Sequence, residues 1–173
     1  MADKEGAPAR ALREEVSARG ERSPRERLAA YLLPGQLHAA AEPTAISTVL
    51  GSCVSVCLFD GLARVGGMNH YLLPTEVEKE RSPRLGGAAM EMLLADVLAL
   101  GARRSRLEAK VFGGASVLGA AAGGRRLGDE NVKLALRFLE SLAVPVVGGD
   151  VGGTRGRKIV FHTDDGAAWV RSL

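Results

Sequence analysis

ISTVLGSCVSVCLFDGLARVGGMNHYLLP, residues 46–74, contains two apolar runs that are separated by a turn at Asp60-Gly61. The first run carries Cys53 and the second carries His70. If the two runs pair as neighbouring strands, a thiol and an imidazole meet on one sheet. That is the arrangement that nucleophilic cysteine chemistry requires. The remaining sequence is therefore interpreted around this pair of strands.

Composition limits the class of protein. A chain of 173 residues suits one domain with a sizeable core. The net charge of +3, with no aromatic residues among the basic clusters, does not indicate nucleic-acid binding. The absence of a long apolar run argues against a secretory signal and against membrane insertion. With only two cysteines a disulfide framework is not supported, so we expect a cytoplasmic protein.

Residues 1–34 carry alternating charges of both signs, and few large apolar residues occur before Leu28. This composition predicts a flexible, non-catalytic N-terminal tail. A docking helix within residues 10–31 is the alternative. We expect the folded domain to span residues 35–173.

The apolar patterns predict a single layered domain. We expect strands over residues 36–41, 45–50, 54–59, 64–73, 107–112, 144–147, 158–163 and 167–173. The spacing of apolar residues predicts helices over 85–100 and 129–142. The glycine content predicts loops over 113–127 and 148–156. Strands, helix, strand, helix and strands in this order predict an α/β or α+β layered fold with a mixed sheet.

Cys53 follows Gly51-Ser52, which permits a sharp backbone turn and leaves amides available near the thiol. Such amides can lower a thiol pKa or stabilise an oxyanion. The alternative is a buried cysteine that only packs, which is our interpretation of Cys57. His70 is the candidate base. A third group should orient its imidazole, and the nearby hydroxyls belong to Ser47, Thr48 and Ser52.

Two other chemistries are less consistent with the pattern. Cys53, Cys57 and His70 supply only three metal ligands and lack a paired CxxC motif. A redox pair of Cys53 and Cys57 would need a disulfide between residues roughly 13 Å apart on one strand, which is beyond disulfide reach. His38 and His162 are expected to be structural or exposed.

Five segments together resemble one family. They are VLGSCVSVCLFD (49–60), GGMNHYLLP (66–74), LEAKVFGGA (107–115), LGDENV (127–132) and GDVGGTRGRKIVFHTDDG (149–166). In this order they resemble the chemoreceptor glutamine deamidase family, CheD, over about residues 36–172.

The resemblance implies a layered α/β/β sandwich similar to the bacterial toxin deamidases, with a Cys–His–Thr hydrolytic site. By position, Cys53 matches the nucleophile and His70 the general base. The threonine position falls on Ser47, which retains the hydroxyl, and Thr48 is one residue later. The implied activity is hydrolysis of glutamine side chains on the cytoplasmic domain of chemoreceptors, without a metal or an organic cofactor. The alternative is a regulatory binding module for a receptor or for a CheC-type chemotaxis phosphatase.

Overall fold

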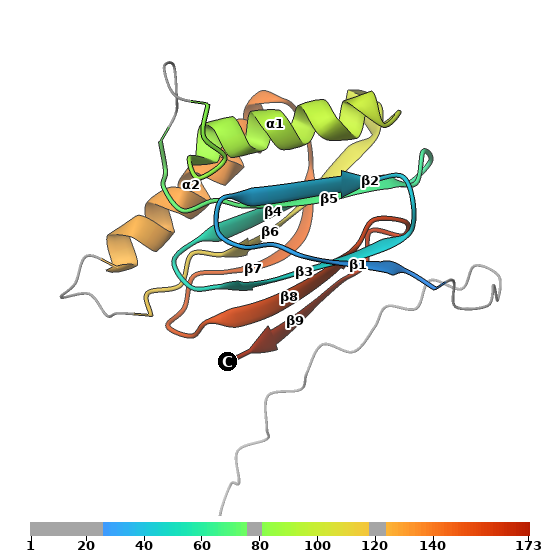
Figure 1. Cartoon of the computed structure of the whole chain (residues 1–173). Helices are drawn as coiled ribbons and strands as arrows, with labels where there is room; N and C mark the ends of the chain where they lie inside the picture. Colours follow the sequence, from blue (N-terminus) through green and yellow to red (C-terminus); the bar gives the residue numbers. More distant parts are fainter. Residues whose placement is uncertain (1–25, 76–80, 118–123) are drawn as a thin grey trace, which may run out of the picture.

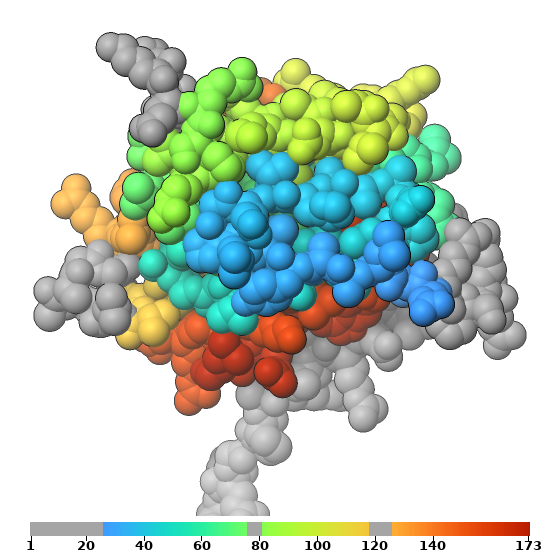
Figure 2. Space-filling model, in the orientation of Figure 1, coloured from blue at the N-terminus to red at the C-terminus, as the bar shows by residue number. Residues whose placement is uncertain are grey.

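The computed structural model describes residues 26–75, 81–117 and 124–173. Two helices cover one face of a five-stranded sheet, and a four-stranded sheet covers its other face (Figure 1). Figure 2 shows these layers in close contact, with α1 above, β1 and β2 across the middle, and β8 and β9 below. The predicted layered α/β/β fold is confirmed.

The strands are β1 (Leu28–Tyr31), β2 (Gln36–Ala40), β3 (Thr44–Leu50), β4 (Val54–Asp60), β5 (Val65–His70), β6 (Leu107–Gly113), β7 (Val146–Val151), β8 (Arg157–His162) and β9 (Ala168–Ser172). The helices are α1 (Gly86–Ala99) and α2 (Gly124–Ser141), with a short 3-10 turn, η1, at Arg104–Arg106. None of the helices in the described part of the chain is long and apolar enough to cross a membrane.

Both sheets are mixed. The larger has the order β2-β5-β4-β6-β7, in which only the β6–β7 pair is parallel. The smaller has the order β1-β3-β8-β9, in which only β1 and β3 are parallel. Strand β4 therefore lies at the centre of the larger sheet, with β5 as its antiparallel neighbour, as the turn at Asp60-Gly61 predicted.

Period-two alternation along β4 separates two cores. Val54, Val56 and Leu58 pack with the helices, in a cluster that includes Leu93 of α1. Cys57 packs in the second cluster, between the two sheets. Cys53, which comes just before β4, packs against this second cluster. Cys53 and Cys57 therefore lie on the side of the strand that faces the smaller sheet.

The two glycines of β5 let other elements lie close to this strand, α1 on the side of Gly67 and the smaller sheet on the side of Gly66. A Cβ at Gly67 would be 2.8 Å from Leu93 Cδ1 and 2.9 Å from Ala39 Cβ, so a larger residue would displace the helix or strand β2. A Cβ at Gly66 would be 2.9 Å from Thr163 Cα, so Gly67 is a packing requirement of the helix layer and Gly66 one of the smaller sheet.

The end of the predicted tail belongs to the fold, so a domain boundary at residue 34 is too late. Residues 28–31 form β1, which pairs in parallel with β3, and Leu32 is buried between the sheets. The segment LAAYLL (28–33) is apolar throughout, and β3 supplies the hydrogen-bonding edge that orders it. Residues 1–25 lie outside the described residues, as does most of the alternative docking helix.

Two predicted loops are shorter than expected. Helix α2 begins at Gly124, within the predicted loop, and Gly128 lets it approach β6, because a Cβ there would be 2.4 Å from the Gly114 carbonyl oxygen. Strand β7 extends through Gly148 and Gly149, because parallel pairing with β6 satisfies the backbone of a glycine-rich segment. Strand β5 ends at His70 rather than at residue 73.

Asp60 holds the turn that joins β4 to β5. Its fully buried carboxylate accepts hydrogen bonds from the backbone amides of Leu62, Ala63 and Arg103 and forms a 2.7 Å ion pair with Arg106. The bond from Arg106 is the main reason why the pKa of Asp60 lies well below its ordinary value. This turn fixes how β4 and β5 pair, and hence where Cys53 and His70 lie.

We expect Asp60→Asn to lower the free energy of unfolding by about 3 kcal/mol, because it leaves a partly buried Arg106 and several amides without their charged acceptor. The unfolded chain protonates Asp60 at higher pH than the folded chain does, so this stabilisation is present above pH 3.8 and is lost as the pH falls below it. Urea unfolding at neutral pH measures the difference. Glu130→Gln is the control, because its ion pair with Lys133 is exposed and should contribute little. Equal effects of the two substitutions would contradict this role for Asp60.

Candidate active site

The register of β4 and β5 places Cys53 and His70 on one face. Cys57 pairs with Met68, and Val54 forms a bridge with Tyr71, so the same register puts Ser55 opposite His70. Cys53 is two residues before Ser55 and lies diagonally across from His70. Diagonal neighbours of this kind are about 7–8 Å apart at the backbone, within reach of long side chains. The thiol and imidazole thus occupy the same side of the sheet, facing the second sheet.

His70 is held by Thr48 of β3, across the gap between the two sheets. Thr48 Oγ1 lies 2.8 Å from His70 Nδ1 and donates its own proton to the Leu32 carbonyl oxygen, also at 2.8 Å. Because the hydroxyl proton is already used, Oγ1 accepts from His70, which places the ring proton on Nδ1. Nε2 then carries the lone pair, and it is buried without a partner among the described residues.

The environment of His70 favours the neutral ring. The side chain is 2% exposed, and burial lowers its pKa to about 4. A neutral imidazole with a free Nε2 lone pair is the form that can accept a proton at neutral pH.

Of the two candidate hydroxyls on β3, only that of Thr48 contacts the imidazole. Thr48 is fully buried and points into the space between the sheets, whereas the adjacent Ser47 is half-buried, and alternation along β3 turns it to the other face. The position in the family pattern favoured Ser47; the geometry favours Thr48. Leu32, which accepts the Thr48 proton, comes from the segment that was predicted to be tail.

We expect Thr48→Val to slow turnover more than Ser47→Ala does. Valine keeps the shape of Thr48 but removes the acceptor that fixes the tautomer and orientation of His70. A lost buried hydrogen bond costs about 1–3 kcal/mol, which on the activation barrier corresponds to roughly 5- to 150-fold in rate. Steady-state turnover of the two variants checks this, with circular dichroism confirming that both fold. A larger loss from Ser47→Ala would restore Ser47 as the third group.

Cys53 is a free, half-buried cysteine in the turn between β3 and β4. Burial raises the pKa of its thiol, while its own backbone amide and the positive charge of Arg84 act in the opposite direction. Cys57 is also free but lies in the inter-sheet core with 1% of its surface exposed, and burial strongly raises its pKa. The two cysteines therefore have different environments, one accessible and one sealed, as the sequence predicted.

Backbone hydrogen bonds fix the turn that carries Cys53. The amide of Gly114 donates to the Cys53 carbonyl at 2.9 Å, and that of Ala115 donates to the Gly51 carbonyl at 2.8 Å. The close approach depends on Gly113, which has φ +106° and whose absent Cβ would overlap the Cys53 carbonyl oxygen. The Gly-Gly-Ala segment after β6 is thus a support for this turn, which explains the glycines that the sequence showed after LEAKVF.

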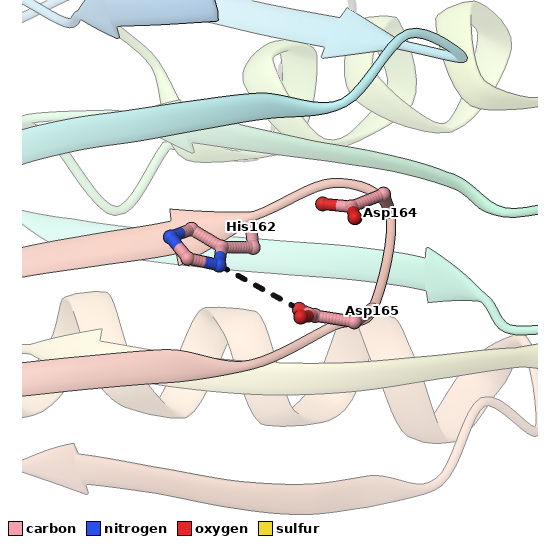
Figure 3. Close-up of side chains that lie close together, drawn as sticks. All are labelled: His162, Asp164 and Asp165. Atoms are coloured by element: carbon pink, nitrogen blue, oxygen red, sulfur yellow. Dashed lines mark ion pairs between the residues drawn. The ribbon is translucent and has the colours of Figure 1, made fainter. Parts of the chain in front are cut away.

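A second polar cluster lies at the turn between β8 and β9. His162, Asp164 and Asp165 have side-chain atoms within 4.8 Å of one another, and His162 Nδ1 is 3.8 Å from Asp165 (Figure 3). Both carboxylates are already paired with Arg27, at 2.7 and 2.8 Å, and Arg64 lies 3.4 Å from Asp164. These arginines neutralise the charge that would attract a cation, and the cluster joins the segment before β1 to the β8–β9 hairpin. His162 also packs on Trp169, in a structural role.

Comparison with known proteins places the chain in a family. A family model described as CheD chemotactic sensory transduction matches residues 72–172, which is more than half of the chain. The chain belongs to the CheD family. The resemblance noted in the sequence is thereby confirmed, and the family match covers the structure from just after β5 through β9.

Curated members of the CheD family are similar over most of their length. A probable chemoreceptor glutamine deamidase CheD 1 of Anaeromyxobacter dehalogenans is 64% identical over 143 residues, covering 83% of this chain and 84% of the relative. A probable chemoreceptor glutamine deamidase CheD of Trichlorobacter lovleyi is 47% identical over 137 residues, covering 79% and 85%. Among solved structures, a Neisseria meningitidis protein of the DUF152 family aligns with 14% identity and a TM-score of 0.41, over 74% of this chain and 64% of that one.

Proposed function

We propose that this CheD chain is a thiol-dependent protein-glutamine deamidase that converts glutamines in the cytoplasmic domain of chemoreceptors to glutamate. Family membership and the names of the curated relatives support the reaction and the substrate class. The observation that carries the assignment to this site is His70, whose Nδ1 is held by Thr48 and whose Nε2 is unpartnered on the face that bears Cys53. A substrate in the cytoplasm implies that the enzyme acts there.

In the proposed reaction, the Cys53 sulfur attacks the carbon of the glutamine carboxamide while His70 Nε2 takes the thiol proton. The tetrahedral intermediate collapses, the C–N bond breaks, and the imidazolium returns the proton to the nitrogen, which leaves as ammonia. Water then attacks the thioester with His70 again as general base, the C–S bond breaks, and glutamate and the free thiol are released. The atoms balance with one water consumed and one ammonia formed, so the reaction requires no metal or organic cofactor.

The electrostatics favour a neutral resting pair. Burial raises the pKa of Cys53 and lowers that of His70, so both groups are uncharged at neutral pH. The proton therefore moves as the sulfur attacks, rather than in a preformed thiolate–imidazolium pair. Arg84, which favours the charged thiolate, is the cation that stabilises sulfur as negative charge develops on it.

The product changes the charge of the receptor. Each conversion replaces a neutral amide with a carboxylate, and like charges at helical neighbour spacing destabilise a helix face by roughly 0.2–0.5 kcal/mol per pair. Several conversions along a receptor helix can therefore shift a signalling equilibrium of a few kcal/mol. Substrate specificity would follow from which glutamines an exposed helix presents to the Cys53 turn.

Incubation of the full chain with a panel of chemoreceptor cytoplasmic fragments tests this function. Peptide mass spectrometry reads each glutamine, and pull-down measures binding in parallel. We expect conversion of particular glutamines to glutamate in at least one fragment. Binding without conversion of any glutamine would overturn the proposal and favour the alternative, a regulatory module that acts on a receptor or on a CheC-type phosphatase through contact alone.

A further inference from the structure

Asn131 of α2 joins the two segments that carry the candidate nucleophile and base. Its side chain is fully buried, and its Nδ2 donates to the carbonyl oxygens of Ser52, at 3.0 Å, and Leu72, at 2.9 Å. Ser52 directly precedes Cys53, and Leu72 follows His70 by two residues. One amide group therefore uses both of its protons to hold the backbone on either side of the site.

Tyr71 holds the backbone of Asn131. The Tyr71 hydroxyl donates to the Asn131 backbone carbonyl at 2.6 Å, and the Tyr71 backbone exchanges two hydrogen bonds with Val54. Because Tyr71 is itself fully buried, the helix is held in place where it meets the β4–β5 pair. The position of the Asn131 side chain is thus determined by packing and not by its rotamer alone.

The bond to Ser52 orients the peptide unit that leads into Cys53. In a trans peptide the carbonyl and the following N–H point in opposite directions, so holding the Ser52 carbonyl toward α2 turns the Cys53 N–H away from it. Within the described part of the chain, no backbone carbonyl accepts from this N–H. The same N–H lies close enough to the Cys53 sulfur to favour its ionised form. A free amide beside the sulfur is also beside the carbon that the sulfur attacks, where an oxyanion develops.

We propose that Asn131 is a positioning residue, which aims the Cys53 amide at the oxyanion by holding the Ser52 carbonyl and keeps the nucleophile and base segments in register through Leu72. This inference rests on the proposed role of Cys53 as a nucleophile. Asn131 itself lies outside the Cys–His–Thr set. Loss of one oxyanion donor typically costs 10²–10³-fold in rate. Because Asn131 orients the donor rather than supplies it, we expect a loss of roughly 10- to 100-fold.

Two reagents separate an oxyanion effect from general damage to the site. Acylation of Cys53 by p-nitrophenyl acetate passes through a tetrahedral oxyanion, whereas alkylation by iodoacetamide displaces iodide and forms none. Both reactions use the full chain without any receptor, and peptide mass spectrometry assigns each adduct to Cys53 rather than to Cys57. The ratio of the two rates therefore reports on the oxyanion donor even if no receptor fragment is a substrate.

We expect the acylation rate relative to the alkylation rate to fall about 10-fold or more in Asn131→Ala and Asn131→Asp, and to remain unchanged in Lys133→Ala, an exposed residue two positions further along α2. With a receptor fragment, the loss should be in kcat rather than in KM.

A folded Asn131 variant with an unchanged ratio of acylation rate to alkylation rate would overturn the proposal. This holds whether both rates fall together or neither rate falls. Failure of both Asn131 variants to fold would also overturn it, because Asn131 would then be required for folding. Absence of receptor conversion by the wild-type chain would instead count against the proposed function.

Discussion

Replacing Cys53 with alanine is expected to abolish deamidation, with a fall in kcat of roughly 10⁶-fold, the scale that follows removal of a covalent nucleophile from a hydrolytic triad. Without the thiol no thioester forms, and the remaining groups can only assist direct attack by water. Release of ammonia from a receptor fragment measures the rate. Because the side chain is small and only half-buried, the variant should fold as the wild type does.

Cys57→Ala is the matched control for this substitution. The two cysteines are four residues apart and face the same side of β4, but Cys57 is enclosed in the inter-sheet core. We expect Cys57→Ala to lose some stability and to keep its activity. Equal loss of activity in both variants would show that the effect arises from packing between the sheets rather than from nucleophilic attack by Cys53.

Replacing His70 with glutamine is expected to lower kcat by 10²–10⁴-fold, the usual contribution of a general base. His38→Gln is the control, because His38 is an exposed residue of β2, on the strand that pairs with β5. Activity of the His70 variant equal to that of the His38 variant would contradict the assignment of His70 as the base.

The pH dependence of the wild-type enzyme provides an independent test of His70. Burial lowers its pKa to about 4, so the acid limb of kcat/KM should lie near pH 4 rather than near the ordinary value of 6.5. The unfolded chain binds this proton at higher pH than the folded chain, so stability also decreases as the pH falls from 6.5 toward 4. Circular dichroism at each pH separates unfolding from loss of the base. An acid limb near pH 6.5 in a folded enzyme would indicate an imidazole exposed to water.

The pairing of β4 and β5 was predictable because it depends on local signals. Two apolar runs flank a turn at Asp60-Gly61, and period-two alternation assigns Cys53 to one face of its strand. The helix α1 was predictable for the same reason, since Met90, Leu93 and Val97 recur at helical spacing and are buried. These features need no knowledge of which other elements pack against them.

The choice between Ser47 and Thr48 could not be made in this way. Adjacent residues on a strand face opposite sides, so the answer depends on which face of β3 meets the larger sheet. That face is set by the inter-sheet core, where Ile46 and Leu50 are buried on the same side as Thr48. The alternation of these apolar residues was the signal available in the sequence. Family position alone indicated the neighbouring serine.

Leu32 and Asn131 were missed because their roles depend on contacts between distant segments. Leu32 lies in the apolar run LAAYLL (28–33) at the end of the segment assigned to the tail, and its carbonyl meets Thr48 only because β1 pairs with β3. Asn131 is a polar residue on the buried side of α2, in the LGDENV segment, and it reaches Ser52 across 79 positions of sequence. A buried asparagine within an apolar helical stripe is the pattern that could have indicated such a residue.

The central claim is that Cys53 converts receptor glutamine to glutamate. The most direct measurement incubates one chemoreceptor cytoplasmic fragment with the wild-type chain and, in parallel, with Cys53→Ala, and reads every glutamine by peptide mass spectrometry over the same time course. We predict glutamate at particular glutamines with the wild-type chain and none above the enzyme-free background with the variant. Conversion of the same glutamines at the wild-type rate by Cys53→Ala would contradict the mechanism.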